Sequence, residues 1–286
     1  MKEYVQKVRI LVESLPYIKE YKNRTVVIKC GGVSLEDEEI RETLIQDIIL
    51  MKYIGINPVI VHGGGVQITT MLEELGIKSE FVDGLRVTDA KSAEVLQMVL
   101  AGQINKKIVS EIQTQGISAA GICGTDGGLF EVEKITPNGN DLGFVGEITR
   151  VNKEVVETLV GGGFVPVIAP VSTDAKGQIY NINADFAARA LAISIKAEKL
   201  IYLSDIEGVR RDIFDRGSVI SYLKIDEVEK YIEDGTISGG MIPKIQSCKT
   251  AVEEGVGSVH ILDGRLEHSL LLEIFTEEGV GTKIER

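Results

Sequence analysis

The stretches TVVIKCGG (residues 25–32) and PVIVHGGG (58–65) share one pattern, an apolar run that ends in consecutive glycines. Short apolar, β-branched runs are typical of buried strands, and glycine ends them. Apolar residues then recur at helical spacing as far as Met51, and Val66 to Leu75 predicts a second helix that Gly76 ends. Two successive units of strand, glycine turn and helix predict an α/β protein.

The same alternation continues to the end of the chain. It predicts strands over 164–169, 199–204 and 258–262, and helices over 184–195, 225–233 and 242–254. The middle is less regular: Asp83-Gly84 indicates a turn between short strands, residues 90–113 indicate a helix, and the glycine-rich residues 117–150 indicate hairpins. The length of 286 residues allows one large domain or two medium ones.

The composition excludes several classes of protein. The formal charge of −12 repels a phosphate backbone, so nucleic-acid binding is not expected, and a small anionic ligand needs a locally positive site. The most apolar run, Ile48 to Ile56, is broken by Lys52, so no membrane span or other membrane association is expected. Three cysteines without a CxxC motif predict no disulfide framework and no metal site, and they fit a cytoplasmic protein.

The first residues carry an apolar stripe. Val5, Val8, Val12 and Leu15 are spaced by three, four and three residues, which places them on one face of a helix that Pro16 ends or kinks. This helix either packs on its own domain or forms an arm that docks on another subunit.

The two glycine turns offer anion sites. Because glycine has no Cβ, main-chain N–H groups can approach a ligand closely, and a helix that begins there adds a positive dipole end. Gly31-Gly32 and Gly63-Gly64-Gly65 both follow a strand, although tight strand-to-helix turns also need glycine for geometry alone. Neither turn matches the P-loop or the G-x-G-x-x-G fingerprint, which disfavours a nicotinamide oxidoreductase.

Two lysines lie beside glycine turns. Lys29 lies at the end of its strand, with only Cys30 between it and Gly31-Gly32, and Lys244 follows Gly239-Gly240 at the start of a helix. Each lysine taken alone is as compatible with a solvated side chain as with a role at a bound phosphate.

Further polar candidates follow at Arg86 and in YNINAD (residues 180–185). The planar guanidinium of Arg86 can bind a carboxylate through two hydrogen bonds, although an arginine near a hairpin is usually solvated. Asn181, Asn183 and Asp185 precede a helix, and one of them is expected to cap it. Three polar residues are more than a cap needs.

Six motifs, VIKCGG, VHGGG, DGLRVTD, YNINAD, LSDIEGV and GGMIPK, occur here in the order found in the amino acid kinase family. The resemblance runs from about residue 9 to residue 284, and it is strongest to the members that phosphorylate N-acetyl-L-glutamate in arginine biosynthesis. The residues Val33-Ser34-Leu35 and Cys30 depart from the pattern of many members. Neither departure removes a catalytic group.

The resemblance implies a three-layer αβα sandwich with a mainly parallel central sheet and an N-terminal helical arm. By this likeness residues 1–20 form an oligomerisation arm, residues 21–180 a lobe that binds the acyl amino acid, and residues 181–286 a nucleotide-binding lobe. ATP with Mg²⁺ would phosphorylate the side-chain carboxylate and give N-acetyl-L-glutamyl 5-phosphate and ADP.

The resemblance also implies roles for particular residues. Lys29 and Lys244 would stabilise the transferring phosphoryl group, and Asp185 would position them. The expected substrate-binding residues are Gly64, Gly65, Arg86 and Asn181, and the expected phosphate-binding residues are Gly31 and Gly32.

The segments LPYIKEY (15–21) and LEHSLLLEIFTEEGVGT (266–282) resemble the arginine-inhibited branch of the family. In that branch the N-terminal helices join dimers into a hexamer, and L-arginine binds near the arm. The candidate arginine contacts are Lys199, His268, Glu273 and Gly279, each of which could equally be a residue of a solvated helix end.

Two other functions remain open. One is a kinase for a longer acyl amino acid, acetylaminoadipate, in lysine biosynthesis. The other is an amino-acid sensor that keeps the fold without turnover, for which the expected sign is a missing lysine, whereas Lys29 and Lys244 are both present.

Overall fold

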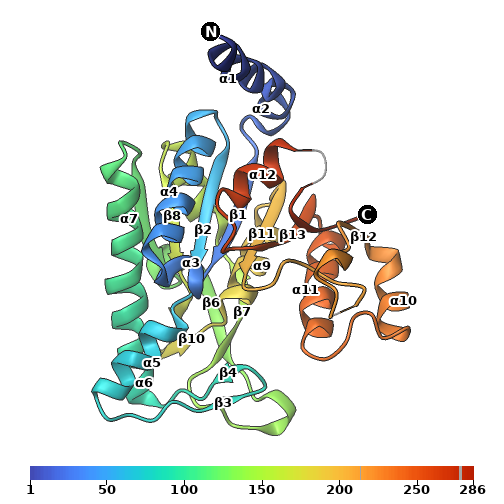
Figure 1. The fold of residues 1–286 in the computed structure, drawn as a ribbon. Coiled ribbons are helices and arrows are strands. Elements are labelled where there is room, and N and C mark those ends of the chain that lie inside the picture. The colour runs from blue at the N-terminus through green and yellow to red at the C-terminus, as the bar shows by residue number, and fades with distance from the viewer. Residues whose placement is uncertain (213, 277–278) are drawn as a thin grey trace.

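The structure is a computed structural model that describes residues 1–212, 214–276 and 279–286. Helices cover both faces of a central β-sheet, and the N-terminal helices α1 (Lys2–Glu13) and α2 (Leu15–Tyr21) project from one end of this body (Figure 1). The predicted three-layer αβα architecture with a helical arm is therefore confirmed.

The central sheet has eight strands in the order β12-β14-β13-β11-β1-β2-β8-β5. Their bounds are β1 (Thr25–Cys30), β2 (Asn57–His62), β5 (Ala119–Cys123), β8 (Val165–Ala169), β11 (Lys199–Ser204), β12 (Tyr222–Lys224), β13 (Ser258–Asp263) and β14 (Gly281–Glu285). Among the described pairings of this sheet, β13 with β14 is antiparallel and the others are parallel. Parallel strands end at a common edge, which is where α/β proteins bind ligands.

Each face of the sheet has its own apolar core. The core that contains Val26 and Ile28 is completed by α4 (Glu38–Tyr53), α5 (Gly65–Glu74), α6 (Ala90–Gln97), α7 (Asn105–Thr114) and α12 (Ser269–Phe275), with the short α3 (Val33–Glu36). The core that contains Val27 is completed by α8 (Lys153–Gly161), α9 (Ala184–Ser194), α10 (Val228–Glu233) and α11 (Met241–Glu253). The alternation along β1 explains why its apolar run is continuous, since both faces are buried.

Three two-stranded ribbons lie outside the central sheet. They are β3 (Phe81–Val82) with β4 (Leu85–Arg86), β6 (Phe130–Lys134) with β7 (Gly146–Val151), and β9 (Val171–Thr173) with β10 (Ile179–Asn181). Short 3₁₀ helices lie at η2 (Asp126–Gly128), η3 (Pro137–Gly139), η4 (Arg216–Ser218) and η5 (Ile225–Glu227). The first ribbon confirms the predicted turn at Asp83-Gly84.

The prediction of hairpins over residues 117–150 is wrong for the first part of that stretch. Ala119–Cys123 forms β5, a parallel edge strand of the central sheet, and the β6–β7 hairpin begins later. One glycine of this stretch, Gly121, permits close packing, because a Cβ there would lie 1.9 Å from Oδ1 of Asn105 on α7.

The helix predicted over residues 90–113 is present but not regular. Between α6 and α7, residues Met98–Ile104 form a π-helical segment, η1. Such wide turns are uncommon and are frequent at functional sites.

The predicted division near residue 180 falls within β10, shortly before α9. Strands β1, β2, β5 and β8 come from residues 21–180, and β11 to β14 come from residues 181–286, so both parts contribute to one sheet. The assignment of separate binding roles to these parts stays a prediction.

The arm touches the body through its second helix. The ring of Tyr17 in α2 packs edge-on against Phe275 of α12, with the ring centroids 6.3 Å apart. In α1, by contrast, Val5, Val8 and Val12 are 57–59% exposed. Within the described part of the chain, no helix combines the length and the apolar character that crossing a bilayer requires.

Candidate active site

The two glycine turns lie against each other. Strands β1 and β2 are parallel neighbours, and Cys30 pairs with His62 at their carboxyl ends. A Cβ built on Gly31 would lie 3.6 Å from the Cα of Gly63, and the amide of Gly63 donates to the carbonyl of Cys30 at 2.8 Å. The two predicted anion-binding turns therefore form one surface at the edge of the sheet.

Lys29 is paired with Asp185. Its ammonium lies 2.9 Å from Oδ1 of Asp185, in the first turn of α9. The cap of α9 is Asn183, whose side-chain oxygen accepts hydrogen bonds from the amides of Asp185 and Phe186 at 2.8 and 3.2 Å. Because Asn183 caps the helix, the carboxylate of Asp185 is left to hold Lys29.

Lys244 reaches the same edge from the other side. It lies in the first turns of α11, and its ammonium donates to Oγ of Ser204 at 3.2 Å. Ser204 ends β11, the strand next to β1 in the sheet. Sequence reasoning did not single out Ser204, although its position at a strand end within LSDIEGV was the available signal.

A pocket with about 200 Å³ of free space lies beside Lys29, which we call the Arg86 pocket. It is lined by Gly63–Gly65, Ile68, Phe81, Gly84, Leu85, Arg86, Leu96, Leu100, Val145, Pro170 and Asn181–Ala184. At Gly64 a Cβ would lie 2.3 Å from Cδ1 of Ile104, in the π-helical segment, so a larger residue does not fit there.

Arg86 is held in the wall of this pocket. Its guanidinium donates to the carbonyl of Gly65 at 2.9 Å and to Oγ1 of Thr69 at 2.8 Å, and it also bonds to Ser79. Burial lowers the pKa of Arg86 from its ordinary value. The amide nitrogen of Asn181 donates to Oγ1 of Thr88 at 3.3 Å, across the pocket wall.

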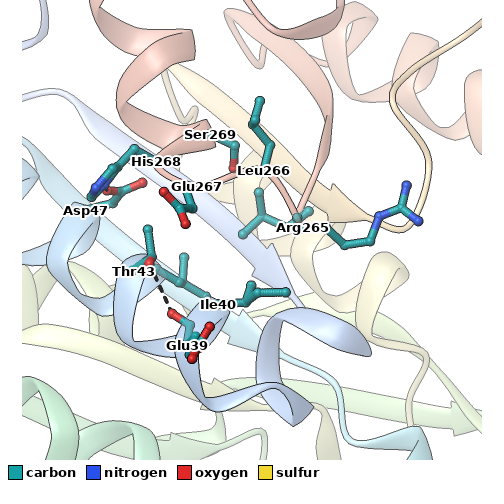
Figure 2. A pocket seen from close by; sticks show the side chains of 12 residues that line it. Glu39, Ile40, Thr43, Asp47, Arg265, Leu266, Glu267, His268 and Ser269 are labelled. Atoms are coloured by element: carbon teal, nitrogen blue, oxygen red, sulfur yellow. Dashed lines mark hydrogen bonds and ion pairs between the residues drawn. The ribbon is translucent and has the colours of Figure 1, made fainter. Parts of the chain in front are cut away.

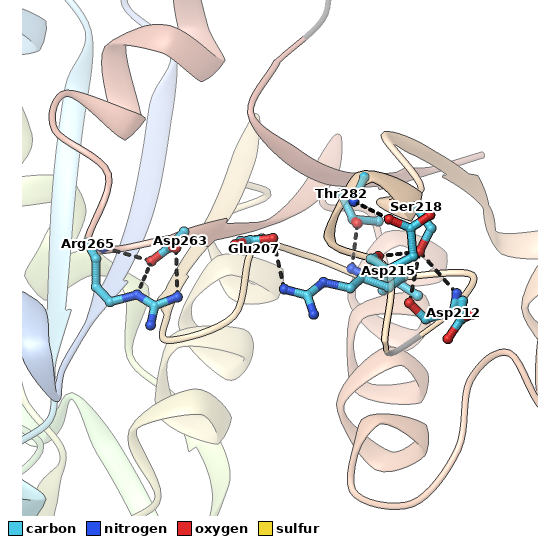
Figure 3. A network of polar contacts seen from close by, with 10 residues as sticks. Glu207, Asp212, Asp215, Ser218, Asp263, Arg265 and Thr282 are labelled. Carbon is cyan, nitrogen blue, oxygen red and sulfur yellow. Dashed lines mark hydrogen bonds and ion pairs between the residues drawn. The ribbon is translucent and has the colours of Figure 1, made fainter.

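A second pocket, the Met241 pocket, has about 250 Å³ of free space and lies beside Lys244. It is lined by Asp205, Ile206, Gly208, Val209, Arg210, Thr236, Ser238 and Met241. The neighbouring polar network holds its loop: the amide of Val209 donates to Oγ1 of Thr282 at 2.8 Å, and Arg210 pairs with Glu207 at 2.8 Å (Figure 3). LSDIEGV contributes half of the residues that line the pocket, but sequence reasoning assigned none of them.

The charged groups lie between the two pockets. Ala184, in the wall of the Arg86 pocket, directly precedes Asp185. Two residues in the wall of the other pocket are also neighbours of the charged groups. Asp205 directly follows Ser204, and Met241 precedes Lys244 by about one helical turn in α11. Two ligands bound in these pockets would therefore face the same lysine pair.

The comparisons with known proteins decide the family. The model of the amino acid kinase family matches residues 24–263. The chain belongs to the amino acid kinase family. The acetylglutamate kinase of Caldanaerobacter subterraneus subsp. tengcongensis is 54% identical over 280 residues, which cover 98% of this chain and 93% of the relative.

Solved structures with a similar fold were also found. The N-acetylglutamate synthase from Neisseria gonorrhoeae, complexed with coenzyme A and N-acetyl-glutamate, has a TM-score of 0.86 and 27% identity. The match covers 98% of this family member and 63% of the synthase, so the chain spans less than two thirds of that enzyme. The same synthase complexed with coenzyme A and L-arginine has a TM-score of 0.81 and 26% identity, over 97% of this chain and 65% of the synthase.

A third pocket in this amino acid kinase lies near the arm. The Lys199 pocket has about 530 Å³ of free space and is lined by Tyr17, Tyr21, Lys199, Ser221, Tyr222, Glu273, Ile274, Thr276, Gly279 and Lys283. It contains three of the four candidate arginine contacts. The ammonium of Lys199 lies 5.0 Å from the centre of the Tyr21 ring, which joins the arm to the pocket.

A buried histidine links the charges of the Lys199 pocket. Nδ1 of His260 lies 2.6 Å from Oε1 of Glu273, and its Nε2 lies 3.2 Å from the ammonium of Lys199. Burial lowers the pKa of His260 to about 4, so the ring is neutral at neutral pH and bridges a cation and an anion. Sequence reasoning missed His260, since a lone histidine inside an apolar strand carries no distinguishing pattern.

The fourth candidate, His268, lies elsewhere. Its Nδ1 is 2.6 Å from Oδ1 of Asp47, and both line a small pocket of about 90 Å³ between α4 and the start of α12 (Figure 2). The structure therefore does not bring His268 together with Lys199, Glu273 and Gly279.

Over residues 1–212, 214–276 and 279–286, no three or more His, Cys, Asp or Glu side chains are grouped so that they could hold a metal ion. The three cysteines are buried and free.

Proposed function

We propose that this chain transfers the terminal phosphoryl group of ATP to the side-chain carboxylate of N-acetyl-L-glutamate. This is the activity that the name of its relatives, acetylglutamate kinase, describes. The observation that carries the proposal is the meeting of Lys29, Asp185 and Lys244 at one edge of the sheet, between two pockets.

The reaction suits these residues. The nucleophile is a carboxylate, which is ionised at neutral pH, so the enzyme needs no general base. The two reactants are both anions, and negative charge spreads over the phosphoryl oxygens in the transition state. Catalysis then requires positioning and cations, which Lys29 and Lys244 supply in a chain whose net charge is −12.

The Arg86 pocket would bind the acyl amino acid. The first amides of α5 at Gly65 have no partner inside the helix and, with the helix dipole, attract a carboxylate. Arg86 and Asn181 would bind the polar groups at the other end of the substrate. The amides of Gly31 and Gly32 would contact the phosphoryl group beside Lys29.

The Met241 pocket would bind the nucleoside of ATP, in agreement with a nucleotide-binding role for residues 181–286. Mg²⁺ takes oxygen ligands and is usually held by substrate phosphates with one or two carboxylates. The carboxylate of Asp205, in the wall of this pocket, is a suitable ligand for it. The ion would neutralise charge on the phosphates.

Release of ADP with four acceptors in parallel tests the reaction. We expect turnover with N-acetyl-L-glutamate and much less with glutamate, aspartate or acetylaminoadipate. Preference for acetylaminoadipate would assign the chain to the longer substrate. Nucleotide binding without turnover on any acceptor would identify an amino-acid sensor and refute the proposal.

We further propose that the Lys199 pocket binds L-arginine as an inhibitor. A ligand with a guanidinium at one end and a carboxylate at the other matches a site with Glu273, Lys199 and Lys283. The synthase from Neisseria gonorrhoeae, which is similar in structure to this chain, was solved in complex with L-arginine, and this supports the proposal.

The assembly proposed is a homo-oligomer, with dimers joined into a hexamer through residues 1–20. The support is the exposed apolar stripe of α1, whose burial requires a second surface. The three free cysteines fit a reducing compartment, and we place the protein in the cytoplasm.

A further inference from the structure

Tyr202 lies beside Lys29 in the central sheet. The two residues are Cα partners in the parallel pairing of β11 with β1. Partner residues on neighbouring strands point to the same face, so both side chains lie on the face covered by α9 and α11. Tyr202 is 2% exposed and is among the largest side chains in the core.

Its hydroxyl group bonds to the helix that carries Asp185. The phenol donates to the main-chain carbonyl of Asp185 at 3.3 Å, in the first turn of α9. That carbonyl belongs to the residue whose carboxylate holds Lys29. The bond therefore acts on the Lys29–Asp185 pair through the backbone.

Its ring lies beside the second lysine. The ammonium of Lys244 is 6.0 Å from the centre of the Tyr202 ring, at the outer limit of a cation–π contact. Cys248, one helical turn further along α11, is also buried against this region. One side chain thus touches both elements that carry the catalytic charges.

The chemistry of the site keeps the phenol neutral. Burial raises the pKa of Tyr202 well above its ordinary value, and the nearby Cys248 and Asp185 act in the same direction. Arg189 and Ser247 oppose this shift without outweighing it. A protonated phenol can donate to the Asp185 carbonyl, and a neutral ring presents its negative face to an ammonium.

A core position of this kind does not itself need a tyrosine. An aliphatic side chain would fill the space, whereas a buried hydroxyl is costly unless it has a partner. Its partners here are the carbonyl of Asp185, the residue whose carboxylate pairs with Lys29, and the side chain of Ser247.

We propose that Tyr202 is a positioning residue that sets the separation between the Lys29–Asp185 pair and Lys244. This inference rests on the proposed phosphoryl transfer. Phosphoryl transfer depends on placing the charges on both sides of the transferring group, so the spacing of the two lysines affects the rate constant more than substrate affinity.

Tyr202→Phe and Tyr202→Leu separate the two contacts. Phenylalanine keeps the ring and loses the hydroxyl, whereas leucine loses both. We expect Tyr202→Phe to lower kcat about fivefold, the effect of one neutral hydrogen bond. The KM values for ATP and N-acetyl-L-glutamate should stay unchanged, and Tyr202→Leu should lower kcat further.

Two controls make the role specific. Tyr231→Phe alters a partly buried tyrosine packed on the same core and should leave kcat unchanged. In a Lys244→Ala background the ring contact has no cation, so Tyr202→Phe and Tyr202→Leu should then have equal kcat values. If Tyr202 only fills the core, Tyr202→Leu should have a lower kcat than Tyr202→Phe whether position 244 is lysine or alanine.

A kcat for Tyr202→Phe equal to that of Tyr231→Phe, or a change confined to KM, would overturn the positioning role while the proposed reaction stands. If the wild-type chain phosphorylates no acceptor, the proposed function fails, and the role of Tyr202 fails with it.

Discussion

The ammonium of Lys29 lies 2.9 Å from the carboxylate of Asp185, and the pair joins the end of strand β1 to the first turn of helix α9. Both side chains are partly exposed, so the pair contributes little to stability in water. Its consequence is geometric: Asp185 aims the ammonium of Lys29 toward the surface formed by Gly31 and Gly63.

Asp185→Asn should therefore lower activity without unfolding the protein. The amide keeps the shape of the side chain but no longer anchors an ammonium. We expect kcat to fall on the order of 10²-fold, the size typical of misplaced catalytic groups. Circular dichroism and thermal melting check the fold, and Asp226→Asn, at an exposed aspartate, is the matched control. A kcat within a few-fold of wild type would contradict the role of Asp185.

Lys244→Ala removes the second cation. One donor aimed at developing charge contributes about 10²–10³-fold in rate, and we expect a loss of at least about that size in kcat. Lys249→Ala is the control on the same helix, because Lys249 pairs with Glu229 at 2.6 Å away from the pockets. Equal activity of the two variants would refute the assignment of Lys244.

Glu273→Gln tests the Lys199 pocket. The variant removes the negative charge available to a guanidinium. Because a hydrogen bond to a charged group is stronger than a neutral one, we expect the L-arginine concentration for half-inhibition to rise at least about tenfold. Each variant is compared with its own uninhibited rate, and Glu253→Gln at the end of α11 is the control. Inhibition of Glu273→Gln at the wild-type concentration would place the arginine site elsewhere.

Deleting residues 1–18 should reduce the assembly to dimers and weaken inhibition by L-arginine. The deletion removes the exposed stripe of α1 and also Tyr17, which lines the Lys199 pocket. The triple variant Val5→Ser, Val8→Ser, Val12→Ser keeps Tyr17. It should reduce the mass of the assembly and leave inhibition by L-arginine unchanged. Light scattering gives the mass of the assembly. If both variants form assemblies with as many subunits as the wild-type protein, the arm does not join the dimers.

Asp47 makes stability depend on pH. Burial raises its pKa to about 6, while the bond from His268 acts in the opposite direction. Since the folded state binds this proton more tightly than the unfolded state, the stabilising contribution is full below about pH 4 and is lost as pH rises through about 6. In urea titrations, wild type should lose stability relative to Asp47→Asn between these values. If the stabilities of wild type and Asp47→Asn change with pH in the same way, the raised pKa of Asp47 is contradicted.

Much of the fold followed from local pattern. The apolar runs and glycines at residues 25–32 and 58–65 predicted β1, β2 and the helices after them, because strands buried on both faces are apolar throughout. The small residues of Ala119–Cys123 gave no comparable signal, since their role is to admit α7 and depends on tertiary contact. The π-helical segment was equally unpredictable from spacing.

The site was predictable in kind and incomplete in detail. Lys29, Lys244 and Asp185 were identified through motifs, whereas Ser204 and Tyr202 act through contacts between strands and helices that no spacing reveals. His268 precedes α12 as its N-cap residue and has a left-handed backbone conformation, whereas Glu273 lies inside the helix. This explains how one can face Asp47 while the other faces Lys199.

The π-helical segment Met98–Ile104 links the shape of the Arg86 pocket to a distant part of the chain. If the segment tightened by one residue into ordinary winding, α7 would rotate by about 100° on its axis, and Ile108 and Ile112, now 2% and 0% exposed, would leave the core. The packing of α7 in the core therefore fixes the rotation of the segment before it. This keeps Leu100 and Ile104 close to Gly64. The winding of this segment therefore sets how closely its side chains approach Gly64, and with it the room left in the Arg86 pocket, which Leu100 lines.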